Sequence, residues 1–231
     1  MPEYITVISV KKVKGGVVSV KTDIDEYLYE ELKDLLPRAD GRRTGSGEEY
    51  RRIYLSPVVA EKYRLNPGVR LEYDTLIEII EASNFARAKN KALSLLTGRD
   101  YSSCGLIKKL SESYPNQAAE RACIEMLRLG FIREEDYCRR LAEDYILHKG
   151  MSKKCAVMKL KEKGFDSILA QSIVDDIDYN PVESINKILN TKYGGMPDDA
   201  ATRRKIYAML YRKGFSSSDI SAAIDEFLYN E

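Results

Sequence analysis

A short segment of this sequence occurs twice, fifty residues apart. Lys159–Phe165 reads Lys-Leu-Lys-Glu-Lys-Gly-Phe, and Met209–Phe215 reads Met-Leu-Tyr-Arg-Lys-Gly-Phe. Each copy has the pattern of a helix end, because apolar residues recur three or four apart and a glycine able to take a left-handed conformation follows. A fixed period is typical of repeat proteins, whose units bury part of their surface on their neighbours. The repeat therefore predicts an array of similar helical units.

A weaker third copy lies a further fifty residues upstream, at Lys109–Pro115, where Pro115 stands in the place of phenylalanine. The apolar positions agree across the three copies better than the turn does. Because a shared apolar period marks shared core positions, we expect five sets of residues to occupy equivalent places. These sets are Leu106, Ala156 and Ile206; Ile107, Val157 and Tyr207; Leu110, Leu160 and Leu210; Ile124, Val174 and Ile224; and Leu127, Ile177 and Phe227.

The apolar spacing after about residue 84 is helical and predicts three modules of three helices each. The connections are short, and Ser103, Asp166 and Ser216 or Ser217 are available as N-caps. The expected helices lie near 84–97, 103–113 and 117–129 in the first module, 134–149, 152–163 and 167–178 in the second, and 181–193, 199–213 and 217–228 in the third.

The first eighty residues have a different pattern, rich in β-branched residues, which predicts a small domain of three or four strands with short helices. The expected elements are a β-hairpin over 4–22 divided at Gly15 and Gly16, a helix over 25–36, a mobile polar loop over 38–49, a strand over Arg52–Leu55, a helix over Val58–Tyr63 with Ser56 at its N-cap, and a strand over Val69–Tyr73.

The expected fold is therefore mainly α, with a small β-rich N-terminal domain and three tandem three-helix modules that form an elongated, curved helical array. A chain of 231 residues with 44% apolar residues is long enough to build these cores. The expected domains are the N-terminal domain over 1–80 and the modules over 84–130, 131–180 and 181–231.

Residues that could carry out catalysis are scattered in this sequence. It contains neither the phosphate-binding pattern G-x-x-x-x-G-K-[ST] nor a dinucleotide-binding G-x-G-x-x-G. Cys104, Cys123, Cys138 and Cys155 are spaced too widely for a zinc site, and only one histidine, His148, could join them. We therefore expect no enzyme activity, metal or cofactor, and we expect the cysteines to act as small buried hydrophobic residues.

The sequence shows no signal peptide and no apolar run of about 18 residues, which predicts a cytoplasmic protein without a membrane contact. Its charges nearly balance, with 37 basic and 36 acidic residues. Residues 81–133 carry nine basic and five acidic residues, whereas 134–180 carry eight and ten. An anion-binding surface must therefore be a local patch.

Basic residues recur at the same place in two modules. Lys153 and Lys154 begin the middle helix of the second module, and Arg203 and Arg204 begin that of the third. Because repeated modules present cations at regular intervals, such residues are candidates for contacts with a partner or with nucleic acid. The candidates are Lys108, Lys109, Arg139, Arg140, Lys149, Lys153, Lys154, Lys159, Lys163, Arg203, Arg204, Arg212 and Lys213. The alternative is that they solvate exposed helix faces while the tyrosines between them pack.

Several stretches resemble the RecX family of regulatory proteins. These are 92–103 with the helix to Leu110, the joining segment Gly130–Cys138, and Lys149–Phe165, whose end the third module repeats. The resemblance covers about residues 84–228, and the N-terminal eighty residues are similar to a β-rich extension of longer family members. The chain departs from the family at Cys138, where alanine is usual, and in the first module, which lacks the Lys-Gly turn.

The resemblance implies a non-enzymatic regulator of the RecA recombinase, acting as a monomer in recombination, DNA repair and the SOS response. Such a protein binds the RecA filament, inhibits its ATPase, strand-exchange and co-protease activities, and binds single- and double-stranded DNA. The residues leave two alternatives open. A general nucleic-acid-binding or adaptor repeat protein would need no ATP-loaded recombinase for tight binding, and an enzyme would need a pocket with convergent polar groups.

Overall fold

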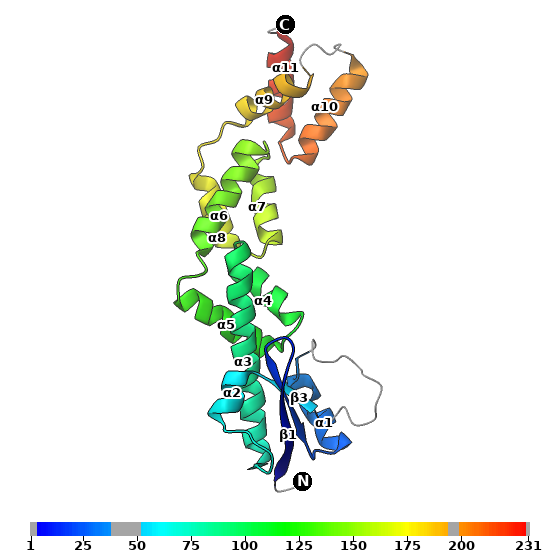
Figure 1. Ribbon diagram of the computed structural model, residues 1–231. Helices are drawn as coiled ribbons and strands as arrows, with labels where there is room; N and C mark the ends of the chain where they lie inside the picture. Colours follow the sequence, from blue (N-terminus) through cyan, green and yellow to red (C-terminus); the bar gives the residue numbers. More distant parts are fainter. Residues whose placement is uncertain (1–3, 38–51, 194–198, 230–231) are drawn as a thin grey trace. The chain divides into compact units, whose positions relative to one another are not determined.

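The computed structural model describes residues 4–37, 52–193 and 199–229. The loop predicted over 38–49 lies outside these ranges. The chain forms two compact units, Met1–Ile132 and Arg133–Glu231. A small antiparallel sheet lies near the N-terminus, and helices make up the rest of the described chain (Figure 1). The expected fold class, mainly α with a β-rich N-terminal part, is confirmed.

The sheet of the first unit contains four antiparallel strands in the order β3-β2-β1-β4. The predicted hairpin is formed by β1 (Ile5–Val13) and β2 (Val17–Thr22), and the predicted strand at 52–55 is β3 (Arg52–Leu55). The fourth strand, β4 (Arg70–Leu71), is shorter than the predicted Val69–Tyr73. Tyr73 belongs instead to the helix that follows β4.

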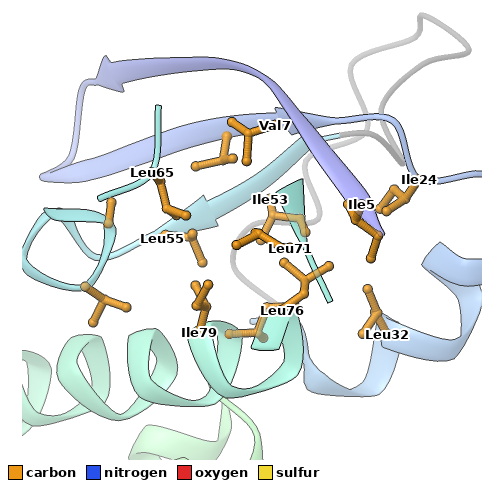
Figure 2. Close-up of a cluster of buried hydrophobic side chains, with 14 of the residues drawn as sticks. Ile5, Val7, Ile24, Leu32, Ile53, Leu55, Leu65, Leu71, Leu76 and Ile79 are labelled. Carbon is orange, nitrogen blue, oxygen red and sulfur yellow. The ribbon is translucent and has the colours of Figure 1, made fainter. Parts of the chain in front are cut away.

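One face of the sheet is buried against helices. Ile5 and Val7 of β1 and Ile53 and Leu55 of β3 are buried in one hydrophobic cluster with Leu76 and Ile79 of the long helix α3 (Tyr73–Gly98). Figure 2 shows Leu55 above Ile79, and Ile5 above Leu32. The other helices around this core are α1 (Glu26–Leu32), a 3₁₀ turn over Lys33–Leu35, and α2 (Pro57–Lys62). Ser56 stands at the N-cap of α2 as predicted, but its side chain makes no capping bond. Its backbone N–H donates instead to Ser83 Oγ at 2.8 Å.

The helix α3 (Tyr73–Gly98) begins eleven residues before the start predicted near residue 84. Its first half buries Leu76, Ile79 and Ile80 under the sheet. Its second half buries Ala88 and Ala92 in the next hydrophobic cluster. The prediction of a helix start near residue 84 is wrong, because one continuous helix packs against both the sheet's hydrophobic cluster and the next cluster along the chain. The boundary predicted between residues 80 and 84 falls inside it.

The first three-helix module is completed by α4 (Ser103–Ser111) and α5 (Asn116–Arg128). Ser102, not the predicted Ser103, caps α4, because its Oγ accepts from Gly105 N–H at 3.1 Å. Leu106 and Leu110 of α4 are fully buried. The middle helix of this module therefore follows the fifty-residue register.

The last helix of the first module departs from that register. Ile124 and Leu127, predicted to be core residues, are 64% and 41% exposed. The turn before α5 is one residue shorter than its counterpart, since Tyr114 N–H bonds to Leu110 O where Phe165 N–H bonds to Leu160 O. Tyr114, not Pro115, thus takes the place of Phe165. The buried positions of α5 move back by one residue and are Ala118, Ala119, Ala122, Cys123 and Met126.

A carboxylate with two cationic partners joins α3 to α5. Glu125 accepts from Lys89 Nζ at 3.0 Å and from Arg128 Nε at 2.8 Å. Hydrogen bonds from Arg128 and then Lys89 lower the pKa of Glu125 from 4.5 to about 2. The ionised carboxylate is therefore favoured in the folded state.

We expect the Glu125→Gln variant to be less stable than the unchanged protein at neutral pH. A lowered folded-state pKa adds stability above the unfolded value of 4.5, and this stability is lost as the pH falls toward about 2. The difference in denaturation midpoint between the two proteins should therefore shrink steadily in acid. Glu120→Gln, on the exposed face of the same helix, is the control. A difference for Glu125→Gln that does not change with pH would contradict the prediction.

The second unit contains two groups of helices. The first comprises α6 (Glu134–Glu143) with a π-helical turn over Asp144–His148, α7 (Lys153–Glu162) and α8 (Ser167–Asp176). The second comprises α9 (Pro181–Tyr193), α10 (Ala200–Arg212) and α11 (Ser217–Tyr229). Each group encloses its own hydrophobic cluster, so the described residues hold four clusters in all. The division of the chain into four separate domains stays a prediction.

The repeated leucines occupy equivalent places. Leu110, Leu160 and Leu210 are each 0% exposed. In the second and third modules the following turn is also the same, since Phe165 N–H bonds to Leu160 O and Phe215 N–H bonds to Leu210 O. Their burial was predicted from the period and is confirmed.

The turn at the end of α10 packs against the segment before α7. Lys213 Nζ donates to Lys149 O at 2.6 Å and to Gly150 O at 3.3 Å. In return, Ser152 N–H donates to Lys213 O at 3.1 Å. Burial is the main cause that lowers the pKa of Lys213. A reciprocal set of bonds therefore ties the third module to the second.

We expect Gly214→Ala to destabilise the protein more than Gly130→Ala. Both glycines have positive φ, +83° and +73°, so alanine is strained at either position. Only at Gly214 would the new Cβ also meet neighbours, with Ser152 Oγ at 2.5 Å and Cys155 Cβ at 3.0 Å. Chemical denaturation should show an excess cost of about 1–3 kcal/mol for Gly214→Ala. Equal costs for the two variants would show that close packing at this turn adds nothing.

Candidate functional site

Helices α7 and α10 each carry an exposed cation at the same position of the fifty-residue register. Lys154 and Arg204 are both exposed, and each lies six residues before the buried leucine of its helix, Leu160 or Leu210. Neither forms an ion pair within the part of the chain that the structure describes. Ser152 caps α7, accepting from Cys155 N–H at 3.1 Å, and Asp199 caps α10, accepting from Thr202 N–H at 2.6 Å, so α10 begins three residues earlier in the fifty-residue register than α7 does.

Their sequence neighbours are placed differently from each other. Lys153 is half-buried, and its Nζ donates to Asp175 O at 3.1 Å, next to the end of α8. Arg203 is exposed on α10. Lys154 and Arg204 thus form the equivalent pair that faces solvent most directly.

The first module has no cation at this position. Cys104 stands where Lys154 and Arg204 stand in the other modules, and it is exposed. The prediction that all four cysteines are buried is therefore wrong for Cys104, because the first-turn position that it occupies points away from the core. Cys123, Cys138 and Cys155 are buried as predicted. Burial raises the pKa of the Cys138 thiol to about 11, which disfavours the reactive thiolate.

Several other candidate cations are held by carboxylates. Lys109 pairs with Glu112, Arg139 with Asp176 at 3.3 Å, Lys149 with Asp144 at 2.6 Å, and Lys159 with Glu162 at 2.7 Å. These pairs lie at the surface, where the strength of an ion pair is small and a phosphate can compete for the cation. Hydrogen bonds that Lys149 and Lys159 donate to Asp144 and Glu162 raise the pKa of the two lysines.

The remaining candidates are of two kinds. Lys108, Arg140, Lys163 and Arg212 are exposed, and Arg140 also lies 6.0 Å from the ring of Tyr137. Lys213 is directed toward the carbonyl groups of Lys149 and Gly150, so its ammonium serves the packing of the modules. Sequence reasoning missed this structural role, because it placed Lys213 with the exposed cations of the same motif.

Two observations bear on other classes of function. No cluster of three or more histidine, cysteine or acidic residues that could hold a metal ion occurs among the described residues. Over the same ranges, no helix is both long enough and apolar enough to cross a bilayer.

Comparisons with known proteins agree on one family. A family model described as RecX, third three-helix domain, matches residues 178–224. The regulatory protein RecX of Mycolicibacterium smegmatis is 27% identical over 153 residues, which cover 63% of this chain and 81% of that protein. The regulatory protein RecX of Chlorobium phaeobacteroides is 28% identical over 144 residues, which cover 61% of this chain and 93% of that protein.

Solved structures share the fold. A crystal structure of regulatory protein RecX aligns with a TM-score of 0.58 at 18% identity and covers 96% of this chain and 99% of its own. The crystal structure of RecX from Lactobacillus salivarius aligns with a TM-score of 0.53 at 22% identity and covers 63% of this chain and 97% of its own. The family model, the relatives and the fold thus all show similarity to the RecX family.

Proposed function

We propose that this protein is a non-enzymatic, monomeric, cytoplasmic regulator that binds the RecA nucleoprotein filament and inhibits its ATPase, strand-exchange and co-protease activities. The family supports a regulatory role, since the relatives are named regulatory proteins. The observation that carries the proposal is the pair Lys154 and Arg204, exposed at equivalent places on α7 and α10. A filament repeats both its subunits and its DNA phosphates, so cations repeated from module to module suit it.

The charges suggest how such a filament would be held. Exposed lysine and arginine side chains release counterions when they neutralise phosphates, and this favours binding to single- and double-stranded DNA. The same cations can meet acidic groups on the recombinase. The proposed contact residues are the thirteen basic residues named above, with Lys213 acting chiefly through the packing of the modules.

Co-sedimentation with RecA assembled on single-stranded DNA tests the proposal. We expect the protein to sediment with filaments formed with a non-hydrolysable ATP analogue, and to slow ATP hydrolysis in proportion to the amount bound. DNA alone and RecA without nucleotide are the controls. Equal binding to bare DNA and to the filament would support a general nucleic-acid-binding protein and would rule out RecA specificity.

A further inference from the structure

Helix α10 presents two tyrosine rings side by side. Tyr207 and Tyr211 lie one turn apart, with ring centroids 6.3 Å apart and ring planes within 10° of parallel. Their exposed fractions are 37% and 62%. The hydrophobic contacts of the helix are made on its other side, by Ile206 and Leu210. The two rings thus offer parallel aromatic surface to solvent.

The same helix carries four cations and no carboxylate. Arg203, Arg204, Lys205 and Arg212 are all exposed, and residues 200–212 contain no aspartate or glutamate. Because side chains four residues apart share a helix face, Arg203 lies in line with the two tyrosines. Arg204 and Arg212 form a second row beside that line. Arginines therefore flank the two tyrosines on one exposed strip.

One ring of the pair is held in place. Tyr207 Oη lies 2.7 Å from Ser217 Oγ at the start of α11, which restrains the ring against the neighbouring helix. Tyr211 then lies parallel to a restrained surface. A ligand that stacks on the pair would lose little rotational freedom of the rings, so the site is partly preorganised.

We propose that this strip of α10 binds single-stranded nucleic acid, with bases stacked on Tyr207 and Tyr211 and phosphates beside Arg204 and Arg212. This inference rests on the proposed function, since it assigns a ligand to one of its helices. Every base has a π-face, so stacking on exposed aromatic residues accepts any sequence, while cations track the backbone. In a duplex these faces are already stacked. The strip therefore favours single strands.

Another protein is a poorer match for the strip. The central part of a protein interface is apolar and depleted of charge. On α10 the aliphatic side chains Ile206 and Leu210 are buried and Met209 is half-buried, so the exposed strip offers arginines on either side of the two rings instead. Charge and ring geometry together favour a polyanion with flat bases.

Fluorescence anisotropy of a labelled oligothymidylate, with the full chain and no recombinase, tests the proposal. We expect Tyr211→Ala to weaken binding at least about fivefold, and Tyr211→Phe to keep most of the affinity. The loss should persist as salt rises, because stacking is not screened, whereas Arg204→Gln should lower the salt slope by about one unit. An abasic oligonucleotide of equal length should bind wild-type and Tyr211→Ala proteins equally.

The matched control is Tyr27→Ala. Tyr27 is 71% exposed on helix α1, beside the carboxylate of Glu31, and should not affect binding. A Tyr207→Ala/Tyr211→Ala protein that folds normally and binds oligothymidylate like the unchanged protein would overturn the inference. So would loss of RecA binding without loss of oligonucleotide binding, which would assign the strip to a protein partner.

These outcomes also separate the inference from the function it rests on. Normal inhibition of RecA by the tyrosine variants, with unchanged oligonucleotide affinity, removes the inference and leaves the proposed function. Loss of oligonucleotide binding in a protein that never inhibits RecA removes the proposed function and leaves the stacking site.

Discussion

Reversing Lys153, Lys154, Arg203 and Arg204 to glutamate is expected to abolish inhibition of the RecA ATPase while the protein stays folded. These cations lie in the N-terminal halves of α7 and α10, outside the hydrophobic clusters. Lys154, Arg203 and Arg204 are exposed and Lys153 is half-buried, and exposed positions rarely contribute more than about 0.5 kcal/mol to stability. Glutamate would repel the phosphates that the cations attract. Inhibition by the unchanged protein should weaken as salt rises, with each phosphate contact adding about one unit to the salt slope.

The exposed pair provides the sharper version of this experiment. Lys154→Glu/Arg204→Glu should cause most of the loss, because neither residue has an ion-pair partner among the described residues. Lys187→Glu/Lys192→Glu on α9 changes the net charge by the same amount at exposed positions outside the proposed set, and should leave inhibition intact. If the α7 and α10 variant folds and still inhibits at the wild-type concentration, the contact surface lies elsewhere in the chain.

Replacing Leu110, Leu160 or Leu210 with alanine is expected to cost about 2–5 kcal/mol in each case. Each leucine is fully buried in the cluster of its own module. Alanine would remove favourable burial and leave a cavity among side chains that relax only in part. Urea denaturation followed by circular dichroism would measure the loss.

The first module supplies a matched control for the leucine series. Leu127 was predicted to be a core residue by the same register, but it is 41% exposed. Leu127→Ala should therefore cost less than Leu110→Ala, although the chemical change is the same. Equal costs would mean that the one-residue shift in α5 is absent in solution.

The sequence alone determined the repeat and most of the helices. Leu110, Leu160 and Leu210 recur at a fixed period, and a period in apolar residues reports directly which side of a helix is buried. Helices such as α7 and α10 were predicted to within a residue or two, because capping residues mark their starts and the Lys-Gly turn marks their ends. Such features can be predicted from the types of the neighbouring residues in the sequence alone.

Only the tertiary structure decided which of the repeated positions are truly equivalent. A turn one residue shorter before α5 exposes Ile124 and Leu127, and a helix shared by two cores moves the start of α3 back to Tyr73. Lys213 is followed by the same Gly-Phe pair as Lys163, yet its ammonium reaches carbonyl groups more than sixty residues away in the sequence. Burial and long-range hydrogen bonds depend on which segments meet in space, and a local pattern does not contain that information.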